Sequence, residues 1–319
     1  MIWNILSFIA GVVLVLKGAD WLTDGASDIA RRYKVSTMVI GLTIVAFGTS
    51  MPELVVSSIA SLQGNTDMAI GNVVGSNLFN TFAIVGCSAL ICPVLCKRNS
   101  LLFDIPICIV ASVIIFFFVS DFSLGGSTIG RLEGIILLVG FCGFLAYTML
   151  IAKQDRKAAK DSSEYIVPAK YKMIIAIGIV LLGLAGLIGG GELLVYGAKG
   201  IAKWLGVSDS VIALTIVAAG TSFPELATSV VAAKKGDTDM ALGNVVGSNI
   251  FNILLILGVS SVINPLDKGN ITDIDVILLV ASSILLLFFS MTKKKIERWE
   301  GAVLVLLMIA YYVWLVLNS

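Results

Sequence analysis

Residues 41–54 read GLTIVAFGTSMPEL, and residues 213–226 read ALTIVAAGTSFPEL. Each is followed by a second shared segment, DMAIGNVVGSNLFN at 67–80 and DMALGNVVGSNIFN at 239–252. Both pairs are offset by 172 positions (213 minus 41, and 239 minus 67), which indicates an internal repeat. The two copies are therefore expected to fold alike and to contribute equivalent residues.

The repeat extends beyond these motifs. Between 36–80 and 208–252, 30 of 45 aligned positions are identical without a gap. The same offset aligns Asp20 with Glu192, Gly25 with Gly197, and Pro93 with Pro265. The duplication therefore covers most of each half of the chain.

The composition places most of the chain in lipid. Its 319 residues are 58% hydrophobic and 13% charged, with a mean hydropathy of +1.00, whereas soluble domains are about half apolar and a quarter charged. A transmembrane helix needs about 20 apolar residues. Stretches of that length predict ten spans, near residues 2–23, 36–61, 68–95, 101–120, 129–152, 173–198, 208–233, 240–265, 274–291 and 299–317.

The expected fold is an all-α membrane protein with two repeats of five transmembrane helices. Five is an odd number, so the second repeat enters the membrane with inverted topology. Helices 2, 3, 7 and 8 contain Gly, Pro and polar residues. Because interrupted helices at membrane depth must face protein or water, these broken helices are expected to form the core.

Charged residues predict the orientation in the membrane. Seventeen Lys and Arg fall in loops on one side and four on the other, with Lys17 inside the first span. The positive-inside rule then places both termini outside. The predicted domains are the first repeat at 1–152, a cytoplasmic linker at 153–172 and the inverted repeat at 173–319. The first span lacks the features of a cleaved signal peptide, and the expected location is the cell (inner) membrane.

Two acidic residues, Glu53 and Glu225, lie near the middle of the second and seventh spans. A charge at that depth costs at least a few kcal/mol by insertion scales, and the interrupted spans contain no Lys or Arg. We therefore interpret the two carboxylates as ligands of a transported cation, and not as members of a buried ion pair. Inverted symmetry predicts that they meet near the bilayer midplane.

Oxygen-bearing side chains surround these acids at helical spacing. Thr49, Glu53 and Ser57 are four residues apart and share a helical face, as do the residues at Thr221, Glu225 and Ser229. Facing stripes carry the second set: Asn72, Ser76, Asn80, Asn244, Ser248 and Asn252. Calcium takes six to eight oxygen ligands in flexible geometry. The chain contains no histidine, the commonest transition-metal ligand and general base, so neither an enzyme nor a bound cofactor is expected.

Two prolines are expected to add backbone ligands. Pro52 and Pro224 lack an N–H and displace the carbonyl four residues earlier. The loosened turns are predicted to expose carbonyls around Ala46 and Ala218. In lipid, such oxygens need a partner such as a cation.

The motifs GTSxPEL and GNVxGSNxFN, each present twice, resemble the alpha repeats of the calcium/cation antiporter superfamily, specifically the short prokaryotic sodium/calcium exchangers. The resemblance implies antiport of Na⁺ and Ca²⁺ by alternating access, with the first and sixth spans sliding against the bundle. It also implies one set of metal ligands: Ala46, Thr49, Ser50, Glu53, Ser76, Asn80, Ala218, Thr221, Ser222, Glu225, Ser248 and Asn252.

One position departs from part of the superfamily. Some relatives, including the potassium-dependent branch, have Asp at the position of Asn252. Here Asn leaves the site with two carboxylates and argues against potassium coupling. One Ca²⁺ or two Na⁺ neutralise the charge of −2, and an empty cage would hold bare charges in lipid. Exchange is therefore expected to be obligatory. The expected partners are these ions and the bilayer, without nucleic acid, and the chain is expected to act as a monomer.

Three alternatives remain open. A Ca²⁺/H⁺ antiporter on the same fold would use protons at Glu53 and Glu225. An ion channel would need a continuous pore, which inverted internal symmetry does not favour. An intramembrane hydrolase using the two acids lacks a GxGD aspartyl motif.

Overall fold

The computed structural model describes residues 1–119, 128–161, 169–206, 218–269 and 271–317, and these are almost entirely helical. Within those ranges, eight helices are long and apolar enough to cross a membrane, and a bent helix pair is a ninth candidate. The predicted seventh span starts at 208, so its first part lies outside the described residues. The all-helical membrane architecture is confirmed, whereas the number of ten spans stays a prediction.

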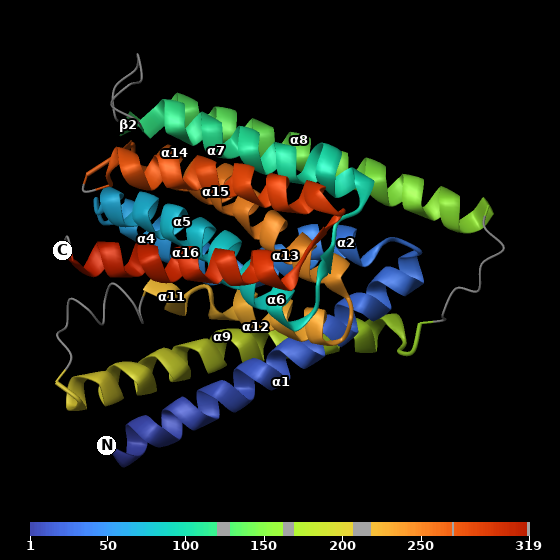
Figure 1. The fold of residues 1–319 in the computed structure, drawn as a ribbon, viewed down its shortest axis with the longest axis horizontal. Helices are drawn as coiled ribbons and strands as arrows, with labels where there is room; N and C mark the ends of the chain where they lie inside the picture. The colour runs from blue at the N-terminus through green and yellow to red at the C-terminus, as the bar shows by residue number, and fades with distance from the viewer. Residues whose placement is uncertain (120–127, 162–168, 207–217, 270, 318–319) are drawn as a thin grey trace.

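Two long helices, α1 (Ile2–Tyr33) and α9 (Met173–Trp204), lie side by side at one edge of the bundle (Figure 1). Glycines bring their backbones together. A Cβ built on Gly18 would lie 2.7 Å from the backbone nitrogen of Leu187, and one on Gly183 would lie 2.6 Å from that of Leu22. Small residues allow such close packing in membranes, so α1 and α9 are joined by direct backbone contact.

The second span is bent at the GTSMPE motif. It consists of α2 (Thr37–Ile40), η1 (Gly41–Val45), α3 (Ala46–Thr49) and α4 (Met51–Leu62), with a bend of 47° between α3 and α4. The second repeat shows the same interruption between α11 (Ala218–Gly220) and α12 (Phe223–Lys234). Each proline occupies the first turn of the following helix, where its missing N–H breaks no helical bond.

The third and eighth spans form the interior. They comprise α5 (Thr66–Phe79), η2 (Asn80–Ile84) and α6 (Val85–Ile91), and α13 (Thr238–Ile250), η5 (Phe251–Leu257) and α14 (Gly258–Ile263). Their spanning windows are 72% and 78% buried, against 22% for α1.

Neither interior span is broken, in contrast to the sequence-based expectation. Each continues through one π-helical segment, η2 or η5, which widens the helix without ending it. The glycines of α13 serve close packing instead. A Cβ on Gly243 would lie 2.7 Å from the carbonyl oxygen of Met38, and one on Gly247 would lie 2.8 Å from the Cα of Leu42.

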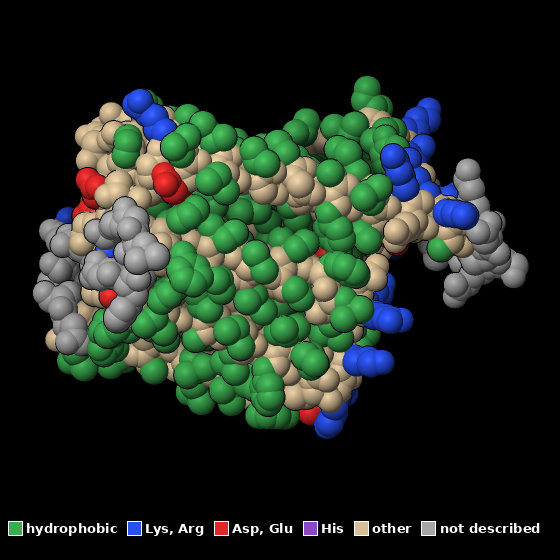
Figure 2. All heavy atoms as spheres, turned by 90° about the horizontal axis from the view of Figure 1, so that it is seen from above, with side chains coloured by type: hydrophobic (Ala, Val, Ile, Leu, Met, Phe, Trp, Pro, Cys, Tyr) green, Lys and Arg blue, Asp and Glu red, His purple; other side chains and the backbone are tan. Residues whose placement is uncertain are grey.

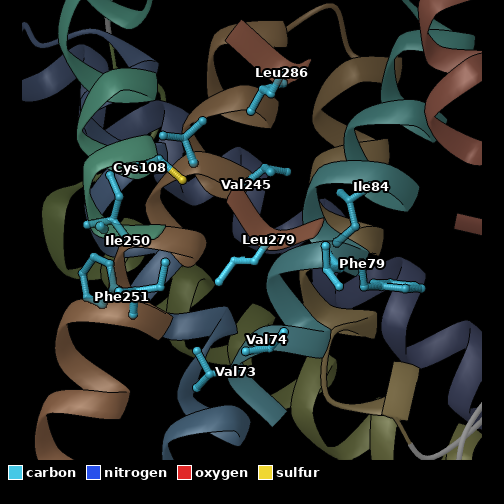
Figure 3. Close-up of a cluster of buried hydrophobic side chains, with 14 of the residues drawn as sticks. Val73, Val74, Phe79, Ile84, Cys108, Val245, Ile250, Phe251, Leu279 and Leu286 are labelled. Atoms are coloured by element: carbon cyan, nitrogen blue, oxygen red, sulfur yellow. The ribbon is translucent and has the colours of Figure 1, made fainter. Parts of the chain in front are cut away.

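The remaining helices cover this interior: η3 (Ser100–Asp104), α7 (Ile105–Val119), α8 (Arg131–Asp161), α15 (Asp273–Thr292) and α16 (Arg298–Leu317). Two short antiparallel pairings tie the halves together, β1 (Val94–Leu95) with β4 (Lys295–Ile296), and β2 (Thr128–Ile129) with β3 (Leu266–Asp267). Apolar side chains of α5, α13, α7 and α15 fill the space between them (Figure 3). Helix α8 continues to Asp161, so part of the predicted linker is helical.

The surface has the pattern of a membrane protein. Figure 2 shows a wide apolar band with Lys and Arg side chains gathered at one end of the molecule. The first residues of α1 and the last residues of α16 lie at the opposite end (Figure 1). This separation fits the charge bias of the loops, although the direction of insertion itself stays a prediction.

Candidate cation site

The two mid-span acids lie together where the repeats meet. Glu53 is in the first turn of α4 and Glu225 in the first turn of α12, and each is 1% exposed. Among the described residues, no Lys or Arg forms an ion pair with either carboxylate. The arrangement therefore concentrates negative charge without a protein cation to neutralise it.

Serine hydroxyls join the acids crosswise between the repeats. Ser50 Oγ donates to Glu225 Oε1 at 2.9 Å, and Ser222 Oγ donates to Glu53 Oε1 at 3.0 Å. Both serines occupy the helix interruptions, with φ and ψ near −84° and 7° for Ser50 and −93° and 6° for Ser222. Leaving helical geometry there lets each repeat hold one oxygen of the other repeat's acid.

Seven predicted ligand atoms are buried and have no hydrogen-bond partner within the described residues: Glu53 Oε2, Ser76 Oγ, Asn80 Oδ1, Thr221 Oγ1, Glu225 Oε2, Ser248 Oγ and Asn252 Oδ1. Only three other side-chain atoms of the described chain share this property, the hydroxyls of Ser88, Ser260 and Ser290. Buried polar atoms nearly always have a partner. Unpaired oxygens of this kind, together with two carboxylates, are the ligands that a hard cation such as Ca²⁺ or Na⁺ takes.

Ala46 and Thr49 differ from this pattern, because their oxygens are already bonded. The carbonyl of Ala46 accepts the N–H of Ser50 at 3.0 Å, and Thr49 Oγ1 donates to the carbonyl of Val45 at 3.1 Å. Because α3 continues to Thr49, the Ala46 carbonyl keeps one helical hydrogen bond, and its second lone pair leaves its role as a ligand a prediction. Pro52 instead has no N–H to offer Gly48. Ala218 begins α11, at the edge of the described residues.

The outer asparagines brace the helices. Asn72 Nδ2 donates to Ser57 Oγ at 2.9 Å and to the carbonyl of Glu53 at 3.3 Å. Asn244 repeats this arrangement with Ser229 at 2.9 Å and Glu225 at 3.3 Å. These stripes were expected to present oxygens; the structure shows that their amides fix the helix turns that carry the acids.

Two asparagines that sequence reasoning did not single out complete the interior. Asn77 and Asn249 accept hydrogen bonds from the amides of Asn252 and Asn80, at 2.9 and 3.0 Å. Both directly follow the site serines in the repeated GSN motif. The repetition was a usable signal, but their spacing puts them outside the four-residue stripe.

A cavity of about 520 Å³ reaches the site from one side. Its walls include Pro52 and Thr221 at the helix interruptions, and Glu192, Tyr196 and Lys199 from the C-terminal half of α9. On the opposite side, Thr49 Oγ1 lies 3.2 Å from Asn244 Oδ1, while its repeat equivalent Thr221 Oγ1 has no partner among the described residues. Among the described residues, the cavity therefore reaches Thr221, while its equivalent Thr49 is not among the residues that line it.

Comparisons with known proteins agree with this architecture. The chain matches the family described as "Sodium/calcium exchanger protein" over residues 3–150 and 175–317. It is 34% identical over 344 residues to sodium/calcium exchanger MaX1 of Methanosarcina acetivorans, covering 97% of each chain. It is 32% identical over 314 residues to inner membrane protein YrbG of Escherichia coli, covering 96% of this chain and 94% of YrbG.

Solved structures show the same fold. A structure of the sodium-calcium exchanger NCX_Mj, soaked with zero Na⁺ and Ca²⁺, superposes with a TM-score of 0.81. The two sequences are 33% identical, and the match covers 99% of each chain.

Proposed function

Because the chain belongs to the sodium/calcium exchanger protein family, we propose that it is a secondary active antiporter that exchanges Na⁺ for Ca²⁺. The proposed site is the buried set of oxygens around Glu53 and Glu225, supplied by both inverted repeats. The observation that carries this proposal is the pair of carboxylates without a cationic partner among the described residues, each with one unbonded oxygen. Because buried charges without a partner are unfavourable, we expect a transported cation to neutralise this pair.

The charge of the site supports alternate occupancy. One Ca²⁺ neutralises two carboxylates, and two Na⁺ do the same; a third Na⁺ on hydroxyl and carbonyl oxygens would leave a charge of +1. The empty site keeps two charges in a low dielectric, which disfavours occlusion. The carrier would therefore change its orientation mainly when loaded.

The cavity supports access from one membrane face at a time. It opens beside Tyr196 and Lys199, on the side that the loop charges assign to the exterior. On the other side, Lys235 Nζ lies 3.1 Å from Asp20 Oδ1, 2.9 Å from Asp24 Oδ1 and 2.8 Å from Thr23 Oγ1, which joins α12 to α1. We propose that the structure is the outward-open state and that α1 and α9 move during transport.

Replacing Lys235 with Gln, the residue at the equivalent position 63 of the first repeat, is expected to favour the inward-open state. These groups are partly exposed, so we expect a change of less than about five-fold, because surface ion pairs contribute roughly 0.2–1 kcal/mol. Labelling of a cysteine at Val195 in the cavity, in a background without native cysteines, should become slower. Lys234→Gln, which removes the same charge from the neighbouring residue, is the control. Equal labelling rates in both variants would show that the contacts of Lys235 with α1 do not stabilise the outward-open state.

A flux assay tests the exchange itself. Proteoliposomes loaded with Na⁺ are diluted into Na⁺-free choline medium containing ⁴⁵Ca²⁺, with the membrane potential clamped by K⁺ and valinomycin. We expect uptake that depends on internal Na⁺ and is unchanged by a proton uncoupler. Uptake that requires a pH gradient would support Ca²⁺/H⁺ antiport instead, and protein-free liposomes set the background.

A further inference from the structure

Four buried asparagines lie on the two interior spans, α5–η2 and α13–η5, whereas the two acids lie on the neighbouring helices α4 and α12. Asn77, Asn80, Asn249 and Asn252 are each 1% exposed. Asn80 Nδ2 donates to Asn249 Oδ1 at 3.0 Å, and Asn252 Nδ2 donates to Asn77 Oδ1 at 2.9 Å. Each hydrogen bond crosses from one repeat to the other.

These bonds decide which end of two amides is free. A side-chain amide has one accepting oxygen and one donating NH₂ group. The NH₂ groups of Asn80 and Asn252 are occupied by the crossed bonds, and their Oδ1 atoms are buried without a partner among the described residues. If either amide were reversed, two oxygens would face each other and an NH₂ group would replace the free oxygen.

Building on the proposed function, we propose that Asn77 and Asn249 are positioning residues, each of which turns the amide oxygen of an asparagine from the opposite repeat toward the transported cation. Asn77 acts through Asn252, and Asn249 acts through Asn80. Without them, the amides can present NH₂ groups, which repel a cation.

The two chains of hydrogen bonds end differently. Asn77 Nδ2 donates to the backbone carbonyl of Asn249 at 3.2 Å, an atom that can only accept. Asn249 Nδ2 donates to Thr81 Oγ1 at 3.0 Å, a hydroxyl that can donate or accept. The equivalent of Thr81 in the second repeat is Ile253. The orientation of Asn252 is therefore fixed even in an empty site, and substitution of Asn77 is expected to have the larger effect.

A crossed set of double variants tests this proposal through equilibrium ⁴⁵Ca²⁺ binding to the purified full chain. Asn77→Leu is expected to weaken binding by about ten-fold, equivalent to about 1.4 kcal/mol, because the freed amide of Asn252 can turn its NH₂ group toward the cation. In an Asn252→Ala background the same change should cost less than about two-fold, and in an Asn80→Ala background about ten-fold. Asn249→Leu should show the reverse pattern, with the smaller loss in the Asn80→Ala background.

The pattern of coupling separates positioning from a general structural role. Equal losses in both backgrounds, or coupling within one repeat, would overturn the proposal, as would a loss that follows the thermal stability of the ion-free protein. Asn77→Ala replaces Asn77→Leu if the latter does not fold. Absence of Ca²⁺ and Na⁺ binding by the unmodified chain would instead overturn the proposed function, and this proposal with it.

Discussion

Replacing Glu53 or Glu225 with Gln is expected to abolish Na⁺-driven Ca²⁺ uptake while the protein still folds. Each substitution removes half of the site's negative charge and offers an NH₂ group in place of an oxygen. Two unit charges 4 Å apart at an effective dielectric constant of 20 interact by roughly 4 kcal/mol, so a loss of about three orders of magnitude in Ca²⁺ affinity is expected. The measurement is the initial rate of ⁴⁵Ca²⁺ uptake into Na⁺-loaded proteoliposomes.

The control for this experiment is Glu192→Gln. It removes the same charge from the wall of the cavity, outside the buried set of oxygens, and should reduce uptake by less than about five-fold because exposed charges are screened. The ion-free Glu53→Gln and Glu225→Gln proteins should be at least as heat-stable as the parent, since a buried charge without a partner is unfavourable. Substantial uptake by either variant would refute the assigned site.

Introducing a large side chain between α1 and α9 is expected to disrupt the fold. A Cβ on Gly18 would lie 2.7 Å from the backbone nitrogen of Leu187, and one on Gly190 would lie 2.8 Å from that of Val15. Backbone atoms cannot move aside as side chains do, so Gly18→Leu and Gly190→Leu should exceed the usual 1–3 kcal/mol of overpacking. We expect each to lower the melting temperature by roughly 10 °C and to abolish exchange.

The matched control is Gly189→Leu on the same helix, where a Cβ would have no described heavy atom within 4 Å. This variant should melt within about 2 °C of the parent, as surface substitutions usually change stability by less than 0.5 kcal/mol. If Gly190→Leu were equally harmless, close packing of α1 against α9 would not be required.

The repeat made much of the site predictable. The offset of 172 residues identified Glu53 with Glu225 and Ser50 with Ser222 as equivalent pairs, and the structure brings each acid to the serine of the other repeat. Equivalence of the repeats predicts that the contact of Ser50 with Glu225 is matched by one of Ser222 with Glu53. These pairs could be predicted without a structure, because residues at equivalent positions of two symmetry-related repeats are expected to lie near the same centre.

Hydrogen-bond direction was not predictable in the same way. The Gly, Pro and polar residues of the third and eighth spans suggested broken helices, but both interior spans continue through a π-helical segment. The roles of Asn72 and Asn77 depend on whether an amide meets a donor or an acceptor across the interface. Atoms distant in sequence, such as the Asn249 carbonyl, determine the orientation of each amide. The spacing of residues along one helix therefore cannot predict that orientation.

The glycine contacts between α1 and α9 also bear on how tightly the two sides of the membrane are kept apart. Glu192 of α9 lines the cavity, and Asp20 of α1 contacts Lys235 on the side that we propose to be closed. Because their backbones are in contact, α1 and α9 would tilt together as one rigid unit. Such a tilt would widen the entrance to the site on one face of the membrane and narrow the entrance on the other. An uncoupled leak of ions through a passage open to both faces would require α1 and α9 to separate from each other.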